Sequence, residues 1–300
     1  YIEYKSKNPY EFYQICNELD QAEPQDSFGW LIFPEKGKKP YPVAVCVHGS
    51  DNWSGHHHEH ILNFLENGIA VFRVHSFDSR GVASTAEDQL AVTAAMMMVD
   101  AVEPLKFLSR HPDIDPKRIA ITGWSLGGIV AFYSAWEPIM EILAPEGERF
   151  CAHLPIYPAT FLQPDEHRWS KAPILSLVGE VDDYTPASLV KDLTKQMQEN
   201  GANADVYEFK NGHHSFDSIN PVTFWPDALA IREKFAQLAS DGSINFTTDK
   251  GEIMSANSFE DRVKIFETGE IVFGAHTGGE WQLRREAMAK ALDFMKKNLL

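Results

Sequence analysis

The sequence predicts an α/β protein with a mostly parallel central sheet flanked by helices on both faces. Two observations carry this prediction: short apolar runs with little polar alternation, and helical patterns between them. Strands that are covered on both faces are apolar throughout, whereas strands with one exposed face alternate. Six such runs lie at 41–47, 68–74, 118–122, 150–156, 173–178 and 204–209.

Other segments complete the expected architecture. Segments 2–6 and 28–33 have strand character, and we expect them to pair antiparallel at the sheet edge. Apolar residues recur every three or four positions along 91–108 and again along 288–299. This spacing predicts a helix before the third apolar run and a closing helix at the end of the chain.

One more helix is expected over 187–199, between the last two apolar runs. Thr185 and Pro186 precede it, and these residue types favour an N-cap and a first helical turn. The pair therefore predicts where this helix begins.

We expect a single domain over residues 1–300, because the sequence contains no internal repeat and no low-complexity linker. Two segments do not fit the bare fold. The segment 154–172 is rich in proline and aromatic residues, and is either a cap loop over a binding pocket or a packed loop. The segment 240–279 is too long for a plain connection before the C-terminal helix. It is either a lid or an excursion with a small hairpin such as 244–248.

Composition excludes several classes of protein. Hydrophobic residues make up 44% of the chain and no apolar run approaches the roughly 20 residues of a membrane helix, which predicts a water-soluble globular protein. The formal net charge of −16 argues against nucleic acid or an anionic membrane as a partner. Cys16, Cys46 and Cys151 lack the spacing of a metal site or a disulfide framework. The location is secreted or periplasmic if a removed leader preceded Tyr1, and cytoplasmic otherwise.

The third apolar run ends in the pattern G-x-S-x-G. Gly123, Ser125 and Gly127 stand where the strand gives way to a helical pattern. A serine on such a sharp turn projects from the edge of the sheet, and side chains at the two flanking glycine positions would collide. The pattern therefore predicts that Ser125 is a nucleophile.

Three other runs end in turns that supply the remaining groups of a hydrolytic site. The first run leads into His48-Gly49-Ser50-Asp51, a glycine turn whose backbone N–H groups can face an oxyanion. The fifth run leads to Asp182, and the sixth leads to His214. The order Ser, Asp, His along the chain is that of the α/β-hydrolases, so we expect that fold.

With these motifs the chain resembles the dienelactone hydrolases and their relatives among the α/β-hydrolases, over roughly residues 28–300. Dienelactone hydrolases proper have a cysteine nucleophile, whereas this chain has Ser125. The resemblance therefore implies the serine ester chemistry of the superfamily rather than lactone specificity. The matching stretches are His48–Ser50, Ser76–Gly81, Gly123–Gly128, Gly179–Asp182, His214–Asp217 and Gly274–Gly279.

Two of these assignments have a neighbour of the same residue type. His213 precedes His214, and the resemblance favours His214 because a small residue and a phenylalanine follow it. Asp183 follows Asp182, and the family spacing, with the acid four residues before Pro186, selects Asp182.

In the expected mechanism His214 takes the proton of Ser125 and returns it to the leaving alcohol, while Asp182 fixes the tautomer of the imidazole. The backbone N–H groups of Ser50 and Leu126 form the expected oxyanion hole. We expect a carboxylic-ester hydrolase that acts on a small-molecule ester without a cofactor. A thioesterase, peptidase or acyltransferase would use the same triad, and a non-catalytic binding protein would share only the fold. The oligomeric state stays open.

Aromatic side chains near these residues are candidates for substrate contact. Tyr157 and Phe161 belong to the possible cap loop, and Tyr184 follows the acid. Trp53 and Trp124 flank the glycine turn and the serine, and a buried packing role is the alternative for both.

The cluster His56-His57-His58-Glu59-His60 places two imidazoles one helical turn apart, as a metal pair would. It lacks the H-E-x-x-H order and an evident third ligand. We therefore predict no metal, and expect these residues to form the solvated start of a helix.

Overall fold

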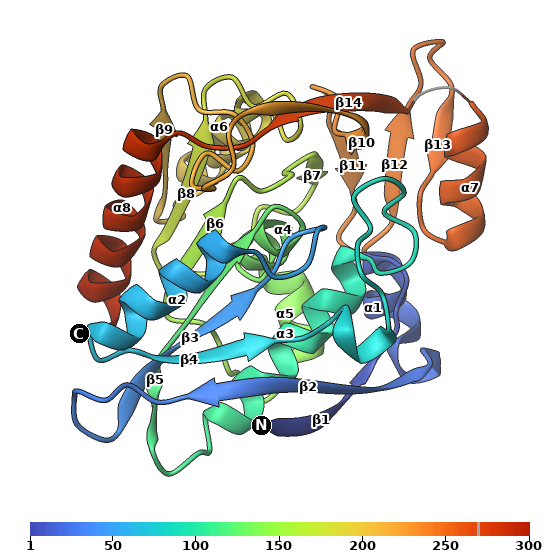
Figure 1. The fold of residues 1–300 in the computed structure, drawn as a ribbon. Coiled ribbons are helices and arrows are strands. Elements are labelled where there is room, and N and C mark those ends of the chain that lie inside the picture. Colours follow the sequence, from blue (N-terminus) through green and yellow to red (C-terminus); the bar gives the residue numbers. More distant parts are fainter. Residues whose placement is uncertain (269–270) are drawn as a thin grey trace.

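The computed structural model describes residues 1–268 and 271–300. Its centre is an eight-stranded sheet made of β1 (Ile2–Lys7), β2 (Pro24–Ile32), β3 (Tyr41–Val47), β4 (Ala70–Val74), β5 (Ile114–Trp124), β6 (His153–Ile156), β8 (Ile174–Gly179) and β9 (Ala204–Phe209). The strands follow the order β1-β2-β4-β3-β5-β6-β8-β9 (Figure 1). β2 pairs antiparallel with both β1 and β4, and every other neighbouring pair is parallel.

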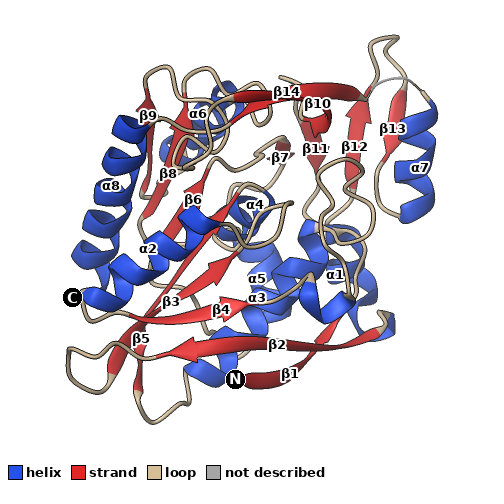
Figure 2. Ribbon diagram, in the orientation of Figure 1, coloured by secondary structure: helices blue, strands red, loops and turns tan. Residues whose placement is uncertain are grey.

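Helices cover both faces of this sheet (Figure 2). One face carries α2 (Gly55–Glu66) and α8 (Trp281–Leu299), which pack against each other. The other face carries α1 (Phe12–Glu18), α3 (Ala94–Leu108), α4 (Leu126–Tyr133), α5 (Glu137–Leu143) and α6 (Ala187–Glu199). Short 3-10 turns lie at Leu19–Gln21 and Asp78–Arg80. None of the helices in the described part of the chain combines the length and apolar character that a bilayer crossing requires.

The two faces of the sheet have separate hydrophobic cores, and the central strands contribute side chains to both. In β3, Val43 and Val45 belong to the core that includes α3 and α4, whereas Ala44 and Cys46 belong to the core that includes α2 and α8. All four side chains are fully buried. Successive side chains of a strand point to opposite faces, so burial on both faces requires an unbroken apolar run.

A long insertion follows the turn after β9, and we define it as Thr223–Thr277. Its first and last strands, β10 (Thr223–Ala230) and β14 (Val272–Thr277), pair antiparallel. Between them lie β11 (Ala236–Leu238), β12 (Ile244–Thr247), β13 (Ile253–Ser255) and α7 (Phe259–Glu267). β11 also pairs with β7 (Leu162–Pro164), giving a second sheet of order β13-β12-β11-β7. The segment 154–172 and the insertion therefore share one sheet beside α1 and α3 (Figure 1).

The expected α/β class is confirmed, and each of the six apolar runs forms a strand. The insertion differs from the expectation, because it begins at Thr223 rather than at 240. β10 gave no strand signal because half of its residues are exposed and Pro226 interrupts the run. The segment 244–248 contains β12, which forms antiparallel hairpins with β11 before it and β13 after it. Residues 269–270 of the predicted excursion lie outside the described residues.

Candidate active site

Ser125 occupies a sharp turn between β5 and α4. Its backbone has φ 53° and ψ −112°, which is strained for a residue with a side chain. A Cβ atom at Gly123 would lie 2.1 Å from the carbonyl oxygen of Gly127, and one at Gly127 would lie 2.2 Å from that of Val47. Because neither contact is possible, the packing of the turn requires glycine at both positions.

Ser125, Asp182 and His214 come together at the edge of the sheet. His214 Nε2 lies 3.0 Å from Ser125 Oγ, and His214 Nδ1 lies 2.9 Å from Asp182 Oδ2. Asp182 and His214 are buried, and Ser125 is half-buried. The three turns meet because β5, β8 and β9 are parallel and their carboxyl ends share one edge. Chemically, this arrangement can move a proton from the hydroxyl to the imidazole.

The Asp182 carboxylate is held by the turn that follows it. Its Oδ1 accepts the backbone N–H groups of Tyr184 at 2.9 Å and Thr185 at 2.8 Å. The Thr185 hydroxyl donates to Asp182 Oδ2 at 3.0 Å and lies 3.0 Å from His214 Nδ1. Predicting Thr185 as the helix N-cap was therefore wrong, since Pro186 is at that position. A threonine before a helix has the same sequence signal in both roles, so the sequence could not separate them.

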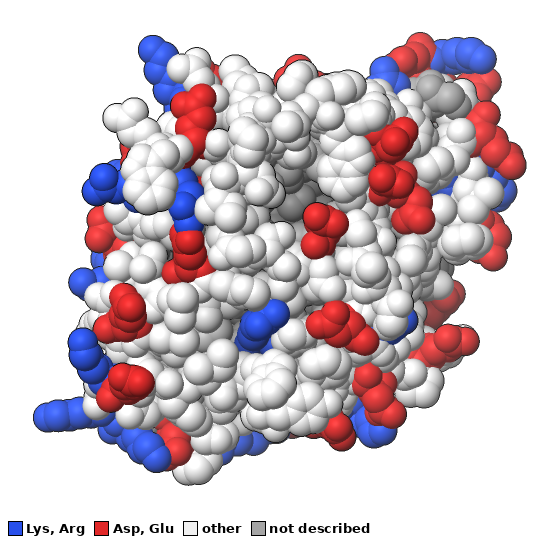
Figure 3. All heavy atoms as spheres, viewed as in Figure 1, with Lys and Arg blue, Asp and Glu red and all other residues white. Residues whose placement is uncertain are grey.

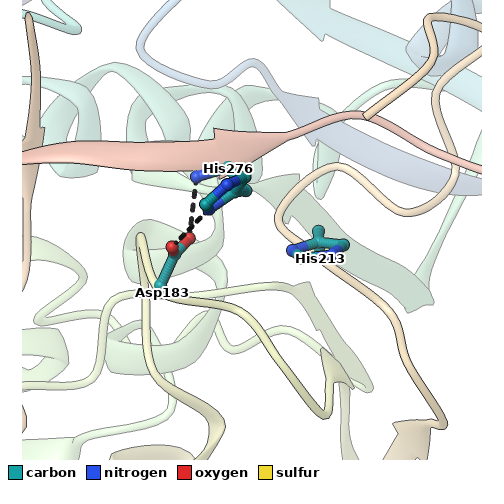
Figure 4. A group of neighbouring side chains, drawn as sticks. All are labelled: Asp183, His213 and His276. Atoms are coloured by element: carbon teal, nitrogen blue, oxygen red, sulfur yellow. Dashed lines mark hydrogen bonds and ion pairs between the residues drawn. The ribbon is translucent and has the colours of Figure 1, made fainter. Parts of the chain in front are cut away.

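The neighbours Asp183 and His213 belong to a different cluster, which His276 of β14 completes (Figure 4). Asp183 accepts from the backbone N–H of His276 at 2.8 Å, and its second oxygen lies 2.7 Å from His276 Nδ1. One ligand-type atom from each of the three residues lies within 4.8 Å of the others, so this group has the composition of a metal site. That no metal is needed stays a prediction. The cluster ties the insertion to the turn that carries the acid.

The glycine turn after β3 packs directly on the serine. A Cβ atom at Gly49 would lie 3.3 Å from Ser125 Cβ, tighter than an ordinary contact. Ser50 is held by a hydrogen bond from Gln89 Nε2 to its hydroxyl at 2.9 Å. Leu126 is the first residue of α4, where helix N–H groups have no partner within the helix. Ser50 and Leu126 both line the cavity that contains Ser125.

The histidine cluster begins α2 as expected, but predicting that it is solvated was wrong, because His56, His57 and His60 are buried. His56 and His60 belong to a hydrogen-bonded network behind His214. His60 Nε2 lies 3.0 Å from Asp217 Oδ2, Tyr157 donates to Asp217 Oδ1 at 3.0 Å, and His56 Nε2 lies 3.2 Å from the Tyr157 hydroxyl. Burial lowers the pKa of His56. Burial raises the pKa of Asp217, but the histidine charges and hydrogen bonds outweigh it and the net pKa is lowered. These side chains hold the loop that carries His214 in place.

Four of the five predicted substrate-contact residues line a cavity beside Ser125. Phe161 and Tyr184 line a cavity beside Ser125, and Tyr157, Tyr184 and Trp124 line a second one. The Trp124 side chain is otherwise fully buried in the core beneath α2. The structure does not bring Trp53 into either cavity, because its indole N–H donates to a backbone carbonyl of β4 at 3.1 Å. Substrate contact by the other four residues stays a prediction.

The sheet order and the strained serine turn at its edge define an α/β-hydrolase fold. The chain belongs to the dienelactone hydrolase family, whose model matches residues 31–223. The match ends at the first residue of the insertion. The stretch Gly274–Gly279, which resembles the family, therefore lies outside the matched region.

Two curated relatives are similar over part of their length. The "Uncharacterized peptidase YuxL" of Bacillus subtilis (strain 168) is 23% identical over 229 residues, covering 62% of this chain and 33% of the relative. The "Probable 2-oxo-3-(5-oxofuran-2-ylidene)propanoate lactonase" of a Bradyrhizobium species is 24% identical over 163 residues, covering 50% of this chain and 64% of the relative. The chain thus spans a third of the length of the first relative and just under two thirds of the second.

Solved structures show the same fold at low identity. A thermophilic esterase of Thermogutta terrifontis with propionate bound has a TM-score of 0.51 and 17% identity, covering 64% of this chain and 81% of that chain. The same esterase phosphoramylated by tabun has a TM-score of 0.51 and 17% identity, covering 64% and 80%.

Proposed function

We propose that the protein is a serine hydrolase that cleaves carboxylic esters through an acyl-enzyme on Ser125. The observation that carries this proposal is the chain of contacts from Ser125 Oγ through His214 to Asp182, at 3.0 and 2.9 Å. A serine hydroxyl is a weak nucleophile until a base takes its proton, and this geometry supplies the base. Membership of the dienelactone hydrolase family supports the same reaction class.

In the first half-reaction, Ser125 Oγ attacks the ester carbonyl carbon while His214 Nε2 takes its proton. The negative charge on the carbonyl oxygen is met by the backbone N–H groups of Ser50 and Leu126, each worth about 3 kcal/mol of barrier. Collapse of this intermediate breaks the carbon–oxygen bond to the alcohol, and His214 protonates the departing oxygen. In the second half-reaction, His214 takes a proton from water as the water attacks the acyl carbon. The bond to Ser125 Oγ then breaks, His214 returns the proton to Ser125, and the acid is released.

Asp182 and Thr185 would position the base rather than contact the substrate. The carboxylate accepts the Nδ1–H of His214, which leaves Nε2 free to accept the serine proton. The backbone N–H groups of Tyr184 and Thr185 hold the carboxylate in this orientation. The imidazolium formed during attack is stabilised by the nearby buried negative charge.

The test compares wild type with Ser125→Ala on short-chain 4-nitrophenyl esters and on an organophosphonate that labels activated serines. We expect turnover to fall on the order of a millionfold, and labelling to disappear, because the variant has no nucleophile. Far-ultraviolet circular dichroism checks that both proteins are folded. Equal rates in the two proteins, or a wild type that neither turns over esters nor takes the label, would overturn the proposal.

A further inference from the structure

Two cavities of different character meet at Ser125. The larger has a volume of about 250 Å³, and the smaller has a volume of about 160 Å³. Ser50, Ser125 and Tyr184 line both cavities, so the serine lies at their junction. An ester bound at Ser125 would have one side in each cavity.

The larger cavity is mostly apolar, and the insertion supplies half of the residues that line it. A cavity of about 150 Å³ lined by apolar side chains is enough to hold a benzene ring. This one therefore has room for a larger group, such as a long alkyl chain or a substituted ring. Its apolar lining comes from α4, the segment 154–172 and the insertion, and includes Ile129, Phe161, Leu229, Phe235, Phe246 and Ile265.

The polar side chains of the larger cavity have partners within the protein. Arg262 forms an ion pair with Glu11, and its guanidinium also donates to the carbonyl oxygen of Gln89 at 2.8 Å. An anionic ligand would compete with both contacts. On the face shown in Figure 3, the surface is hollowed above α4 and acidic side chains lie beside the hollow. Charge and lining therefore both favour a neutral apolar group.

The smaller cavity is the more polar of the two, although Trp124, Tyr157 and Trp225 also line it. Hydroxyl, amide and imidazole groups from the turn after β3, the start of α2 and the loop after β9 line it, including Ser54, His56, His57, Ser218 and Asn220. Hydroxyl and imidazole groups can make more than one hydrogen bond, so they can also bind a small polar molecule, whereas an alkyl chain here would lie against polar atoms.

His214 distinguishes the two sides of the ester. It lines the smaller cavity and is not among the residues lining the larger one, whereas Leu126 lines only the larger one. The leaving oxygen must lie within hydrogen-bond reach of His214 Nε2 to receive its proton. The alcohol therefore lies on the side of the smaller cavity, and the acyl group lies on the side of Leu126 and the larger cavity.

We propose, resting on the proposed ester hydrolysis, that the substrate joins a large apolar acyl group to a small polar alcohol. The insertion selects the acyl group, and the polar pocket beside His214 selects the alcohol. Hydrolysis adds water across the carbon–oxygen bond and yields a free apolar carboxylic acid and the alcohol.

Two mirrored ester series test this assignment, with acid release followed in a pH-stat. The first has ethylene glycol as a fixed alcohol and acyl groups from acetyl to decanoyl. The second has acetyl as a fixed acyl group and alcohols from ethanol to decanol. We expect kcat/KM to rise by up to about fourfold per methylene in the first series until the cavity is filled, because each methylene leaves water. In the second series it should stay level or fall.

A filling substitution links the first series to the insertion. Ala236 is buried in β11 and lines the larger cavity, so Ala236→Phe occupies the space of several methylenes. We expect the ratio of decanoyl to acetyl kcat/KM to fall by at least about tenfold. Ile253→Phe is the matched control, because Ile253 lies in β13 of the same insertion and is 76% exposed. If Ala236→Phe does not fold, Ala256→Phe fills the same cavity from a half-buried position.

The outcomes separate this inference from the function on which it rests. A level or reversed chain-length profile, with turnover that is lost in Ser125→Ala, overturns the substrate assignment and leaves ester hydrolysis standing. An unchanged ratio in Ala236→Phe also overturns it. Failure of every ester in both series, or turnover that survives in Ser125→Ala, overturns the proposed function itself.

Discussion

The parallel sheet and the insertion place their residues by different physical means. In β3 the side chains from Pro42 to Val47 are buried, and such strands have one possible register because both faces are covered. In the insertion, Phe224, Ile253 and Phe273 are each more than half exposed. The sheet thus fixes the positions of Ser125, Asp182 and His214, whereas the insertion contributes an apolar face beside them. We therefore expect substitutions in the two regions to affect the reaction and the choice of substrate separately.

Strand pairing, backbone hydrogen bonds and side-chain pairs attach the insertion to the rest of the fold. The backbone N–H groups of Leu229 and Ile231 donate to the carbonyl oxygens of Ala86 and Tyr184. β11 pairs with β7, Arg262 of α7 pairs with Glu11, and His276 pairs with Asp183. By contrast, the loops of Asp182 and His214 are held by buried hydrogen bonds. Substitutions on the two sides of this boundary should therefore differ in the size and kind of their effect.

The largest effect on kcat is expected from a comparison of two adjacent histidines, His214 beside Ser125 and His213 beside the insertion. His214→Ala removes the base 3.0 Å from Ser125 Oγ, and should reduce kcat by a factor on the order of 10⁴ to 10⁶. His213→Ala removes a side chain that lies with Asp183 and His276, and should change kcat by less than about threefold. Steady-state kinetics on one short-chain ester measure both. Comparable losses of kcat in the two variants would contradict the assignment of His214, and not His213, as the base.

The second prediction concerns the packing between the central sheet and the turn that carries Ser125. Gly127→Ala brings a Cβ within 2.2 Å of the carbonyl oxygen of Val47 and 2.4 Å of that of His48. Because backbone atoms of a buried strand cannot move aside, we expect a loss of at least about 4 kcal/mol in the free energy of unfolding, or no folded protein. Urea unfolding followed by tryptophan fluorescence measures it.

The matched control is Gly55→Ala at the start of α2, where a Cβ would meet no atom within 4 Å. Its effect on the free energy of unfolding should stay within about 1 kcal/mol, since alanine is the better helix former. A Gly127→Ala variant as stable as this control would mean that the turn can relax.

The extent to which the sequence predicts this molecule follows the same division. The run 41–47 and the glycines around Ser125 predict strand and turn because their reasons are local: burial on both faces and backbone collision. The neighbours Asp182 and Asp183 are distinguished in the structure by contacts with His214 and His276, which lie far along the chain. β10 was not predicted because its partner, β14, follows more than 40 residues later and half of its own residues are exposed. No local pattern encodes such a pairing.

The third prediction tests how dry the sheet interior is. His153 of β6 is buried with its Nδ1 near the Ala131 carbonyl oxygen and the Ser134 hydroxyl, and burial lowers its pKa to about 4. In the unfolded chain the His153 side chain has an ordinary pKa near 6.5 and is protonated below that pH. The free energy of unfolding therefore decreases as the pH falls from 6.5 toward 4. Between pH 7.5 and 5 this one residue should cost about 2 kcal/mol.

His153→Gln removes the titration, so its unfolding free energy should fall about 2 kcal/mol less than that of wild type over the same pH interval. Urea unfolding at the two pH values measures the difference, independently of any loss that the substitution causes at pH 7.5. The matched control, His58→Gln, replaces an exposed histidine of α2 and should alter the pH dependence much less. An unchanged pH dependence in His153→Gln would mean that water reaches this face of the sheet.

The smallest effect is expected where the insertion is tied to the acid turn. His276→Ala removes the contact between His276 Nδ1 and the Asp183 carboxylate. The His276 side chain is 43% exposed and that of Asp183 is 47% exposed. Exposed pairs contribute at most about 1 kcal/mol, so the global free energy of unfolding should change by less than that. The loss should instead appear locally, as faster amide hydrogen exchange in β10 and β14, because the variant removes one of the contacts that hold these strands to the rest of the fold.

Lys191→Ala supplies the matched control, since it removes an exposed ion pair with Glu208 between α6 and β9, on the sheet side of the boundary. Its removal should leave exchange in β10 and β14 unchanged, because the covered strands beneath it have a cooperative core of their own. Exchange by mass spectrometry on the two variants resolves the two regions. If His276→Ala left β10 and β14 as protected as they are in Lys191→Ala, the other contacts of the insertion would be enough to hold these strands, and the Asp183 contact would be incidental to their position.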